Sequence, residues 1–261
     1  MAEDLPKTGN FLKGRLRHAM SRREEEILEE LMGPITELGP DEVCQSRAHL
    51  VTTSTMLVDG FMARSITENG QRQIVEINVP GDFIDLHGFA LKRLDHDLVA
   101  IGSARIANVS HTDLADALAK EPHLARLLWF STLLSAAIHR EWIVKMGQLR
   151  ADARLAHVFA ELWQRLDFVG KGRRNGFDTP LKQTDLADIC GTTPVYINRL
   201  LRDLREADVA EFRRGRIWVT SREKLERHCR FNPEYLYGQG ALAVRHELDP
   251  VKVDAPSAPK P

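Results

Sequence analysis

One long apolar stripe limits what this chain can fold into. From Pro122 onward, apolar side chains recur every three or four residues, the spacing of one face of an α-helix, and no Gly or Pro interrupts the pattern before Gly147. A helix of this length extends about 40 Å at 1.5 Å per residue, longer than one small domain needs to cover its core. The stripe consists of Leu124, Leu127, Ser131, Leu134, Ile138, Trp142, Met146 and Leu149.

Two kinds of partner could cover this stripe. Leu128 and Phe130 lie off it and can face the chain's own domain, while the stripe itself meets a second copy of the helix. The pattern therefore predicts a homodimer. The alternative, in which the stripe packs on the chain's own β domain, stays open. The residues predicted at the dimer interface are Leu127, Leu134, Ile138 and Trp142.

The segment before the stripe has the alternation and turn residues of β-structure. Asp59-Gly60 separates two short runs and indicates a hairpin, and Glu68-Asn69-Gly70 indicates a second turn. Between residues 75 and 79 apolar and polar side chains alternate, which places Glu76 and Asn78 on the side away from the apolar face. The strands predicted for this antiparallel domain are 55–58, 61–66, 75–79, 98–101 and 104–109.

The order of elements predicts an α+β chain with two domains. A polar helix is expected over residues 21–32, before Gly33-Pro34. A new helix is predicted after Asp152, its N-cap, with an apolar face from Leu155 to Leu166, so the segment 147–152 is predicted to be a hinge. The predicted division is 1–33 for an N-terminal helical segment, 34–120 for the β domain, 121–149 for the long helix, 150–232 for a C-terminal domain and 233–261 for a flexible tail.

Residues 181–201 have the pattern of two short helices joined at Gly191. Gly191 supplies the tight turn, Thr193 is suited to cap the second helix, and Pro194 fits its first position, where the missing N–H costs nothing. This arrangement is typical of a helix-turn-helix, whose second helix enters the major groove of DNA. The apolar residues predicted on the inner faces are Leu186, Ala187, Ile189, Ile197, Leu200, Leu201 and Leu204.

Polar side chains around this motif are suited to contact DNA. Arg pairs with guanine and Asn with adenine, so the outward positions of the second helix are candidate base contacts: Val195, Asn198, Arg199 and Arg202. Two short strands, 209–212 and 216–219, predict a wing with a basic tip, and a helix over 222–230 closes the domain. The residues predicted to contact the DNA backbone are Lys182, Gln183, Thr193, Arg213, Arg214 and Arg216.

The charge distribution agrees with a nucleic-acid partner. The net charge is −1, but residues 171–230 contain 14 Lys and Arg against 9 Asp and Glu, so this region carries +5 and the remainder −6. Three cysteines without a CxxC pair predict a reduced cytoplasmic setting and no metal site. No signal peptide or membrane span is expected, and no catalytic motif is present, so no enzyme is predicted.

Several short motifs occur in a fixed order along residues 30–232. They are Gly60-Phe61, Gly70-Gln71-Arg72-Gln73-Ile74, Pro80-Gly81-Asp82-Phe83-Ile84, Gln183-Thr184-Asp185-Leu186-Ala187 and Asn198-Arg199-Leu200-Leu201. With the order of parts, they resemble the cyclic-AMP receptor protein and fumarate-nitrate regulator (Crp/Fnr) family of bacterial transcription factors, most of all its alphaproteobacterial branches. The resemblance implies a cyclic-nucleotide-binding-like β-roll, a long dimerisation helix and a winged helix-turn-helix. It also implies a palindromic double-stranded DNA operator, RNA polymerase as a partner, and a signal bound at the β-roll.

The chain departs from the cofactor signatures of this family. Members that bind cyclic nucleotides use a Gly-Glu pair where this chain has Asp85 and Leu86, and an acidic side chain would repel the phosphate. Iron-sulfur members need a cysteine cluster, but only Cys44 lies outside the DNA-binding half. The carbon monoxide sensor ligates haem through a His near the position of His87, yet its cysteine partner is replaced here by Asp85. Cyclic AMP, an iron-sulfur cluster and haem are therefore not expected.

An effector pocket is still expected at Asp85, Leu86 and His87, for a ligand that the sequence does not identify. The alternative function is an effector-binding regulatory or adaptor protein without DNA-binding activity. Binding of the purified protein to a fragment of its own promoter would distinguish the two.

Overall fold

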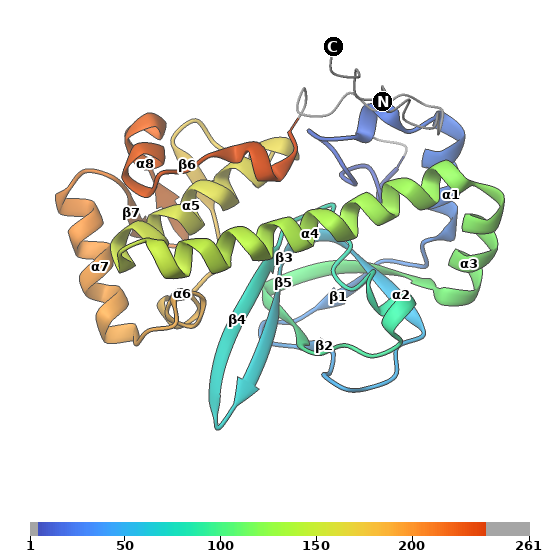
Figure 1. Ribbon diagram of the computed structural model, residues 1–261, viewed down its shortest axis with the longest axis horizontal. Helices are drawn as coiled ribbons and strands as arrows, with labels where there is room; N and C mark the ends of the chain where they lie inside the picture. Colours follow the sequence, from blue (N-terminus) through green and yellow to red (C-terminus); the bar gives the residue numbers. More distant parts are fainter. Residues whose placement is uncertain (1–4, 239–261) are drawn as a thin grey trace, which may run out of the picture.

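The computed structural model describes residues 5–238 and has the predicted α+β architecture (Figure 1). A β-roll lies against the long helix, and a winged helix-turn-helix lies at the C-terminal end of that helix. The sheet of the roll has the strand order β1-β5-β3-β4, with β2 also paired to β5, and every pairing is antiparallel. Its strands are β1 (Thr36–Leu38), β2 (Val43–Gln45), β3 (Thr53–Glu68), β4 (Gln71–Asn78) and β5 (Asp97–Ser110).

The hairpin predicted at Asp59-Gly60 is wrong, because β3 continues through it. Gly60 has a φ of +85° and lies at a β-bulge, where the register of β3 against β5 shifts. A Cβ at this position would overlap the carbonyl oxygen of Ser103. The break predicted between residues 101 and 104 is also absent, because Gly102 lies within β5 at a φ of +70°. These glycines allow two long paired strands to bulge and approach closely.

The second predicted turn is confirmed. Asn69 and Gly70 have φ values of +52° and +75°, and they join β3 to β4 in a tight hairpin. The alternation predicted from Val75 to Val79 is interrupted, because the register of β4 against β3 shifts at Val75, and Ile74 instead of Val75 is buried in the core with Ile77. The polar residues of β4 are buried too, since Glu76 and Asn78 are 2% and 1% exposed. Strand β4 therefore has no solvent face at these positions.

In Figure 1, α4 runs above the roll, and α1 and α3 lie at its right-hand end. The polar helix predicted over 21–32 is confirmed as α1, and Ser21 forms a capping box with Glu24 at its start. The long helix is confirmed as α4. The helical bounds are η1 (Arg17–Ala19), α1 (Arg22–Leu31), α2 (Gly88–Leu91), α3 (His111–Lys120) and α4 (Pro122–Gln148).

Most of the apolar stripe of α4 packs inside its own chain, but only part of it packs on the β domain as in the alternative that the sequence left open, and Met146 is 44% exposed. Leu127 belongs to the core between the roll and the N-terminal segment, and Leu134 and Ile138 pack against Leu236. The predicted assignment of Leu127, Leu134 and Ile138 to a dimer interface is corrected accordingly, because each is at most 6% exposed within one chain. The fourth residue, Trp142, is half-buried and also packs within the chain.

The predicted winged helix-turn-helix is present in the C-terminal half. Its small sheet has the order β6-β8-β7, in which β6 was not predicted from the sequence. Arg214 and Gly215, at φ values of +52° and +72°, form the turn at the tip of the wing. The elements are α5 (Ala151–Phe168), β6 (Gly176–Asp178), α6 (Gln183–Cys190), α7 (Pro194–Glu206), β7 (Glu211–Arg213), β8 (Arg216–Trp218) and α8 (Arg222–Cys229).

The chain changes from α4 to α5 at Leu149 and Arg150, inside the segment predicted to be a hinge. Asp152 was predicted to cap α5, but Arg150 occupies the N-cap position and makes no side-chain cap. Asp152 lies in the first turn instead, 3.1 Å from Nε2 of His228. Its carboxylate therefore joins α5 to α8.

One apolar core joins the roll to the C-terminal domain. It contains Ile74 and Ile77 of β4, Phe159 and Leu162 of α5, and Leu186 of α6. The division predicted at residue 150 marks the break between helices, but the packing is continuous across it. The two halves therefore contact each other through buried side chains.

The predicted tail over 233–261 is wrong for its first residues. The short helix η2 (Pro233–Leu236) packs against α4, and Leu236 is fully buried. The carbonyl of Leu236 accepts a hydrogen bond of 2.9 Å from Nε of Arg15, in the N-terminal segment. The remainder of the predicted tail, from residue 239, lies outside the described residues. No helix between residues 5 and 238 is long and apolar enough to cross a membrane.

Candidate functional site

Helix α7 presents a polar face that its own turn and cap position. Gly191 ends α6 in the left-handed conformation, and Oγ1 of Thr193 accepts a hydrogen bond of 3.3 Å from the backbone N–H of Tyr196. Pro194 occupies the first turn, as predicted. The inner residues Ile197, Leu200, Leu201 and Leu204 are buried, so the opposite face of α7 must point outward.

The four predicted base contacts all lie on that outward face. Val195 is 82% exposed, and Asn198, Arg199 and Arg202 are exposed too. Asn198 donates a hydrogen bond of 3.1 Å to the carbonyl of Pro194, which holds its amide close to the helix start. The first turns of α7 thus present two guanidinium groups, an amide and a small apolar side chain on one surface.

The predicted backbone contacts divide into two groups. Thr193 beside α7 and Arg213 and Arg214 at the wing tip are exposed. Arg216 is held inside the wing, because its guanidinium lies 3.5 Å from the ring centroid of Trp218. Lys182 is exposed but forms an ion pair of 2.8 Å with Asp41 of the roll.

Gln183, the remaining predicted backbone contact, begins α6 and is half-buried. The first helix of the motif is therefore less accessible than the second.

A cavity of about 260 Å³ lies between the roll and α4. Leu86 and His87 line it, as predicted, together with Arg64 and His96 of the roll. Burial, followed by the nearby charge of Arg64, lowers the pKa of His87 to about 4. Burial also lowers the pKa of His96. Both imidazoles are therefore neutral at neutral pH.

Asp85, the third predicted pocket residue, does not line the cavity. It is fully buried, and its carboxylate accepts hydrogen bonds from the backbone N–H and the hydroxyl of Thr55. Burial raises the pKa of Asp85 to about 6. Its role is to hold the turn after β4 against β3, and its assignment to an effector pocket is corrected.

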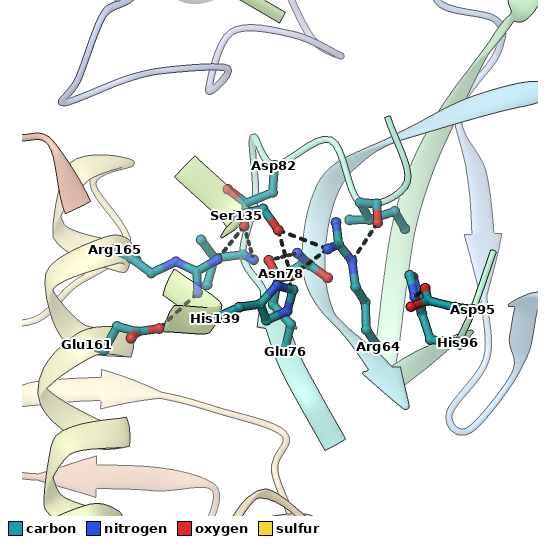
Figure 2. A network of polar contacts seen from close by, with 12 residues as sticks. Arg64, Glu76, Asn78, Asp82, Asp95, His96, Ser135, His139, Glu161 and Arg165 are labelled. Atoms are coloured by element: carbon teal, nitrogen blue, oxygen red, sulfur yellow. Dashed lines mark hydrogen bonds and ion pairs between the residues drawn. The ribbon is translucent and has the colours of Figure 1, made fainter. Parts of the chain in front are cut away.

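Sequence reasoning missed a network of buried polar groups beside this cavity (Figure 2). Its first part centres on Glu76 of β4, which lies 2.7 Å from Nη1 of Arg64 and 3.0 Å from Nε2 of His139. The hydroxyl of Ser135 on α4 accepts from Arg64 and donates to Glu76. Burial raises the pKa of Glu76, but Arg64 and His139 outweigh it and hold that pKa well below its usual range.

The second part of the network centres on Arg165 of α5, which is 1% exposed. Its guanidinium bonds Asp82 of the roll at 2.6 Å and Glu161 at 3.2 Å. Burial opposes the charged guanidinium, yet these two carboxylates raise its pKa. Glu161 also accepts from Nε1 of Trp142 and from the hydroxyl of Tyr235. We call both parts together the junction network, because they link the roll, α4 and α5.

A separate contact holds α6 to the hairpin of β3 and β4. Arg72 bonds Asp185 at 2.5 Å and Asp188 at 2.6 Å, and the amide of Gln73 donates to the carbonyl of Asp188. Arg72 and Gln73 belong to a motif noted in the sequence, but nothing in that motif identified the partners. The helix-turn-helix is thus attached to the roll by charge as well as by apolar packing.

Comparison with known proteins gives this site its context. Residues 153–228 match the family model of a Crp-like helix-turn-helix domain. The transcriptional activator protein FnrL of Cereibacter sphaeroides is 26% identical over 145 residues, which cover 54% of this chain and only 58% of FnrL. The nitrogen fixation regulation protein FixK of Bradyrhizobium diazoefficiens is 24% identical over 234 residues, which cover 88% of this chain and 84% of FixK.

Solved structures show the same fold. The structure of FixK2 from Bradyrhizobium japonicum matches with a TM-score of 0.68 at 21% identity, covering 74% of this chain and 96% of FixK2. The c-di-GMP responsive regulator CLP of Xanthomonas campestris matches with a TM-score of 0.63 at 11% identity, covering 77% of this chain and all of CLP. These likenesses extend over both the roll and the helix-turn-helix.

Proposed function

We propose that this chain binds DNA sequence-specifically as a homodimer and regulates transcription. The premise is that the chain belongs to the Crp/Fnr family and carries its helix-turn-helix domain. The observation that carries the proposal is the exposed face of α7, where Arg199 and its neighbours follow a tight turn at Gly191 and a Thr193 cap. In this motif the start of the second helix is the part that enters the major groove. The wing tip, Arg213 and Arg214, would then lie on phosphates.

The proposed dimer forms through a face of α4 that the chain itself leaves uncovered. Trp129, Leu133 and Ile143 on this face are 66%, 51% and 71% exposed. Exposed or half-exposed residues recur there at intervals of three and four, which is the spacing of a coiled-coil seam. These residues are Arg126, Trp129, Leu133, Ala136, Arg140, Ile143 and Gly147. Two copies of α4 paired along this seam bury large apolar side chains that one chain exposes to water.

A two-fold dimer implies a palindromic operator. Two recognition helices related by such an axis lie about 34 Å apart, one turn of B-DNA between half-site centres. A partner of this kind places the protein in the cytoplasm, and regulation implies contact with RNA polymerase. The cavity between the roll and α4 supports modulation by a small signal, because α4 contributes to both that cavity and the proposed seam.

A selection experiment tests the proposal. Purified protein is used to enrich sites from a random pool of DNA duplexes, and a palindrome is expected. Binding to that site and to a scrambled duplex is then titrated at fixed salt for Arg199→Ala. A bidentate contact to guanine contributes on the order of 1–3 kcal/mol of discrimination, so the affinity ratio should fall about tenfold.

The matched control is Arg227→Ala, which removes the same charge from α8 of the same domain, where Arg227 pairs with Glu223. It should leave the ratio unchanged. An unchanged ratio for Arg199→Ala would remove this residue from the base-contacting face. If no sequence is enriched at all, sequence-specific binding by the protein as purified is refuted, and the effector-binding or adaptor alternative is favoured.

A further inference from the structure

Three potential metal ligands meet at one edge of the cavity between the roll and α4. One ligand atom from each of His87, Asp95 and His96 lies within 4.8 Å of the other two. Figure 2 shows Asp95 and His96 side by side, close to Arg64. The imidazole rings of His87 and His96 are 5.2 Å apart between centroids. The sequence predicted no metal site, because its three cysteines form no ligand motif.

The hydrogen bonding of this cluster leaves two imidazole nitrogens without partners. Nδ1 of His96 is 2.7 Å from Oδ1 of Asp95, so Nε2 is the nitrogen of this ring that is left for another partner. Nε2 of His96 and Nε2 of His87 are both buried and have no hydrogen-bond partner. His96 itself is only 4% exposed. Buried polar atoms are nearly always paired, so the unpartnered nitrogens of these two neighbouring rings are available to a ligand.

The charges around the cluster are compatible with a cation. Arg64 is a positive group beside the cluster and opposes a cation there, but Glu76, 2.7 Å from its guanidinium, offsets part of this charge. Asp95 contributes a carboxylate whose side chain is 84% exposed, so it can turn toward a bound ion. On the opposite wall, α4 contributes the hydroxyls of Ser131 and Thr132. The cavity therefore has room for water or a small ligand at the remaining coordination positions.

We propose that His87, Asp95 and His96 bind a divalent first-row transition metal ion, and that this ion is a signal for the regulator proposed above. Two imidazoles and one carboxylate suit Zn²⁺, Co²⁺ or Fe²⁺, whereas Mg²⁺ and Ca²⁺ require oxygen ligands. To bind the same ion as Nε2 of His96, the carboxylate of Asp95 must turn away from Nδ1 of that ring, which its exposure allows.

A physical route connects this ion to the DNA-binding domain. A dication beside Arg64 would repel its guanidinium and change its bonds to Glu76 and to Ser135 of α4. Glu76 also contacts His139 of α4, one turn before Trp142, which bonds Glu161 of α5. The junction network thus runs from the proposed metal site to the first helix of the DNA-binding domain.

Metal titration of the full chain tests the site directly. The protein is stripped with chelator and titrated with Co²⁺ and Zn²⁺, following visible Co²⁺ absorption and heat. One ion per chain is expected, and His87→Ala or His96→Ala should weaken binding about tenfold or more. The control is His49→Ala, an exposed histidine of the same roll outside the cluster, which should bind as the wild type does.

Circular dichroism and thermal unfolding verify that each variant is folded. A double variant, His87→Ala with His96→Ala, that is folded and binds Co²⁺ as tightly as the wild type overturns the proposal. Failure of the wild-type protein to bind either ion above the level of that double variant overturns it as well.

The signalling half is tested separately by DNA affinity. Zn²⁺ should change affinity for the selected operator about fivefold or more in the wild type but not in His96→Ala. Metal binding without any change in DNA affinity would overturn the role as a signal and leave the site intact. This inference rests on the proposed function, yet absence of sequence-specific DNA binding would appear in the selection experiment and leave the metal titration unaffected.

Discussion

The outward face of α7 and the junction network both depend on arginine, in opposite surroundings. Arg199 is exposed on a short helix, and residues within a few positions, Gly191 and Thr193, determine where it points. Arg165 is 1% exposed and bonds Asp82, 83 residues earlier in the chain. An exposed arginine is available to a ligand, whereas a buried one must be paired to be tolerated. Changes to α7 should therefore affect binding, and changes to the junction network should affect stability.

The largest effect is expected for Arg165→Ala. Removing the guanidinium leaves the fully buried Glu161 and the half-buried Asp82 without their charge partner, and loss of such a buried pair typically costs about 3–5 kcal/mol of unfolding free energy. Urea unfolding followed by circular dichroism measures this difference. Arg199→Ala, the matched exposed arginine, should change stability by no more than about 0.5 kcal/mol. An equal loss of unfolding free energy in Arg165→Ala and Arg199→Ala would contradict the proposed difference between the junction network and α7.

Substitutions at two neighbouring residues of α4 should affect dimerisation in one case and protomer stability in the other. Leu133 is 51% exposed on the proposed seam, and Leu134 is 6% exposed in the protomer core. Leu133→Glu should weaken dimerisation by about 2 kcal/mol or more without lowering protomer stability. Leu134→Ala should cost about 2–5 kcal/mol of unfolding free energy and leave the dimer intact. Sedimentation at several concentrations, combined with urea unfolding, measures both quantities.

If the dimer is retained in Leu133→Glu and dissociates in Leu134→Ala, the interface is formed by the stripe predicted from the sequence. Both variants retaining the dimer would remove α4 from the interface altogether.

Local chemistry explains which parts of the structure could be predicted. The hairpin at Asn69-Gly70 and the turn at Gly191 follow from backbone conformations that few other residues adopt. Gly60 was misjudged because a glycine that permits a bulge looks the same in the sequence as one that forms a turn. Only the strand paired with it, β5, decides between them.

In the candidate site, too, some residues could be predicted from the sequence and others could not. Arg199 could be predicted because helical spacing places it opposite Ile197 and Leu201. Glu76 could not, because alternation along β4 predicts a solvent side and the helix that buries this side comes some sixty residues later. Likewise, α4 has apolar residues on more than one face, and periodicity alone does not say which face packs within the chain.

Two buried carboxylates should give opposite pH dependence of stability. The pKa of Glu76 is held far below its ordinary value of 4.5, so its stabilising contribution is present above about pH 4.5 and is lost as the pH falls. The pKa of Asp85 is raised from 3.8 to about 6, so its contribution is present below about pH 3.8 and is lost as the pH rises through 6. Urea midpoints measured across this range should show Glu76→Gln reducing the acid-side loss and Asp85→Asn reducing the loss toward neutral pH.

If both variants shift the midpoint by the same amount at every pH, neither carboxylate changes its pKa on folding. A loss of acid sensitivity in Asp85→Asn rather than in Glu76→Gln would reverse the assignment.

The smallest effect is expected at the wing, and it concerns DNA alone. Arg213 is exposed beside the turn at Arg214 and Gly215, so Arg213→Ala should leave folding unchanged. A phosphate contact carries no sequence information, so its loss should weaken binding to operator and to scrambled DNA by the same factor. It should also make the slope of log affinity against log salt shallower by about one, because one fewer counterion is released. Titrations at three salt concentrations measure both quantities beside Arg199→Ala, which should lower the operator preference. An altered operator preference with an unchanged salt slope for Arg213→Ala would instead place this residue on the bases.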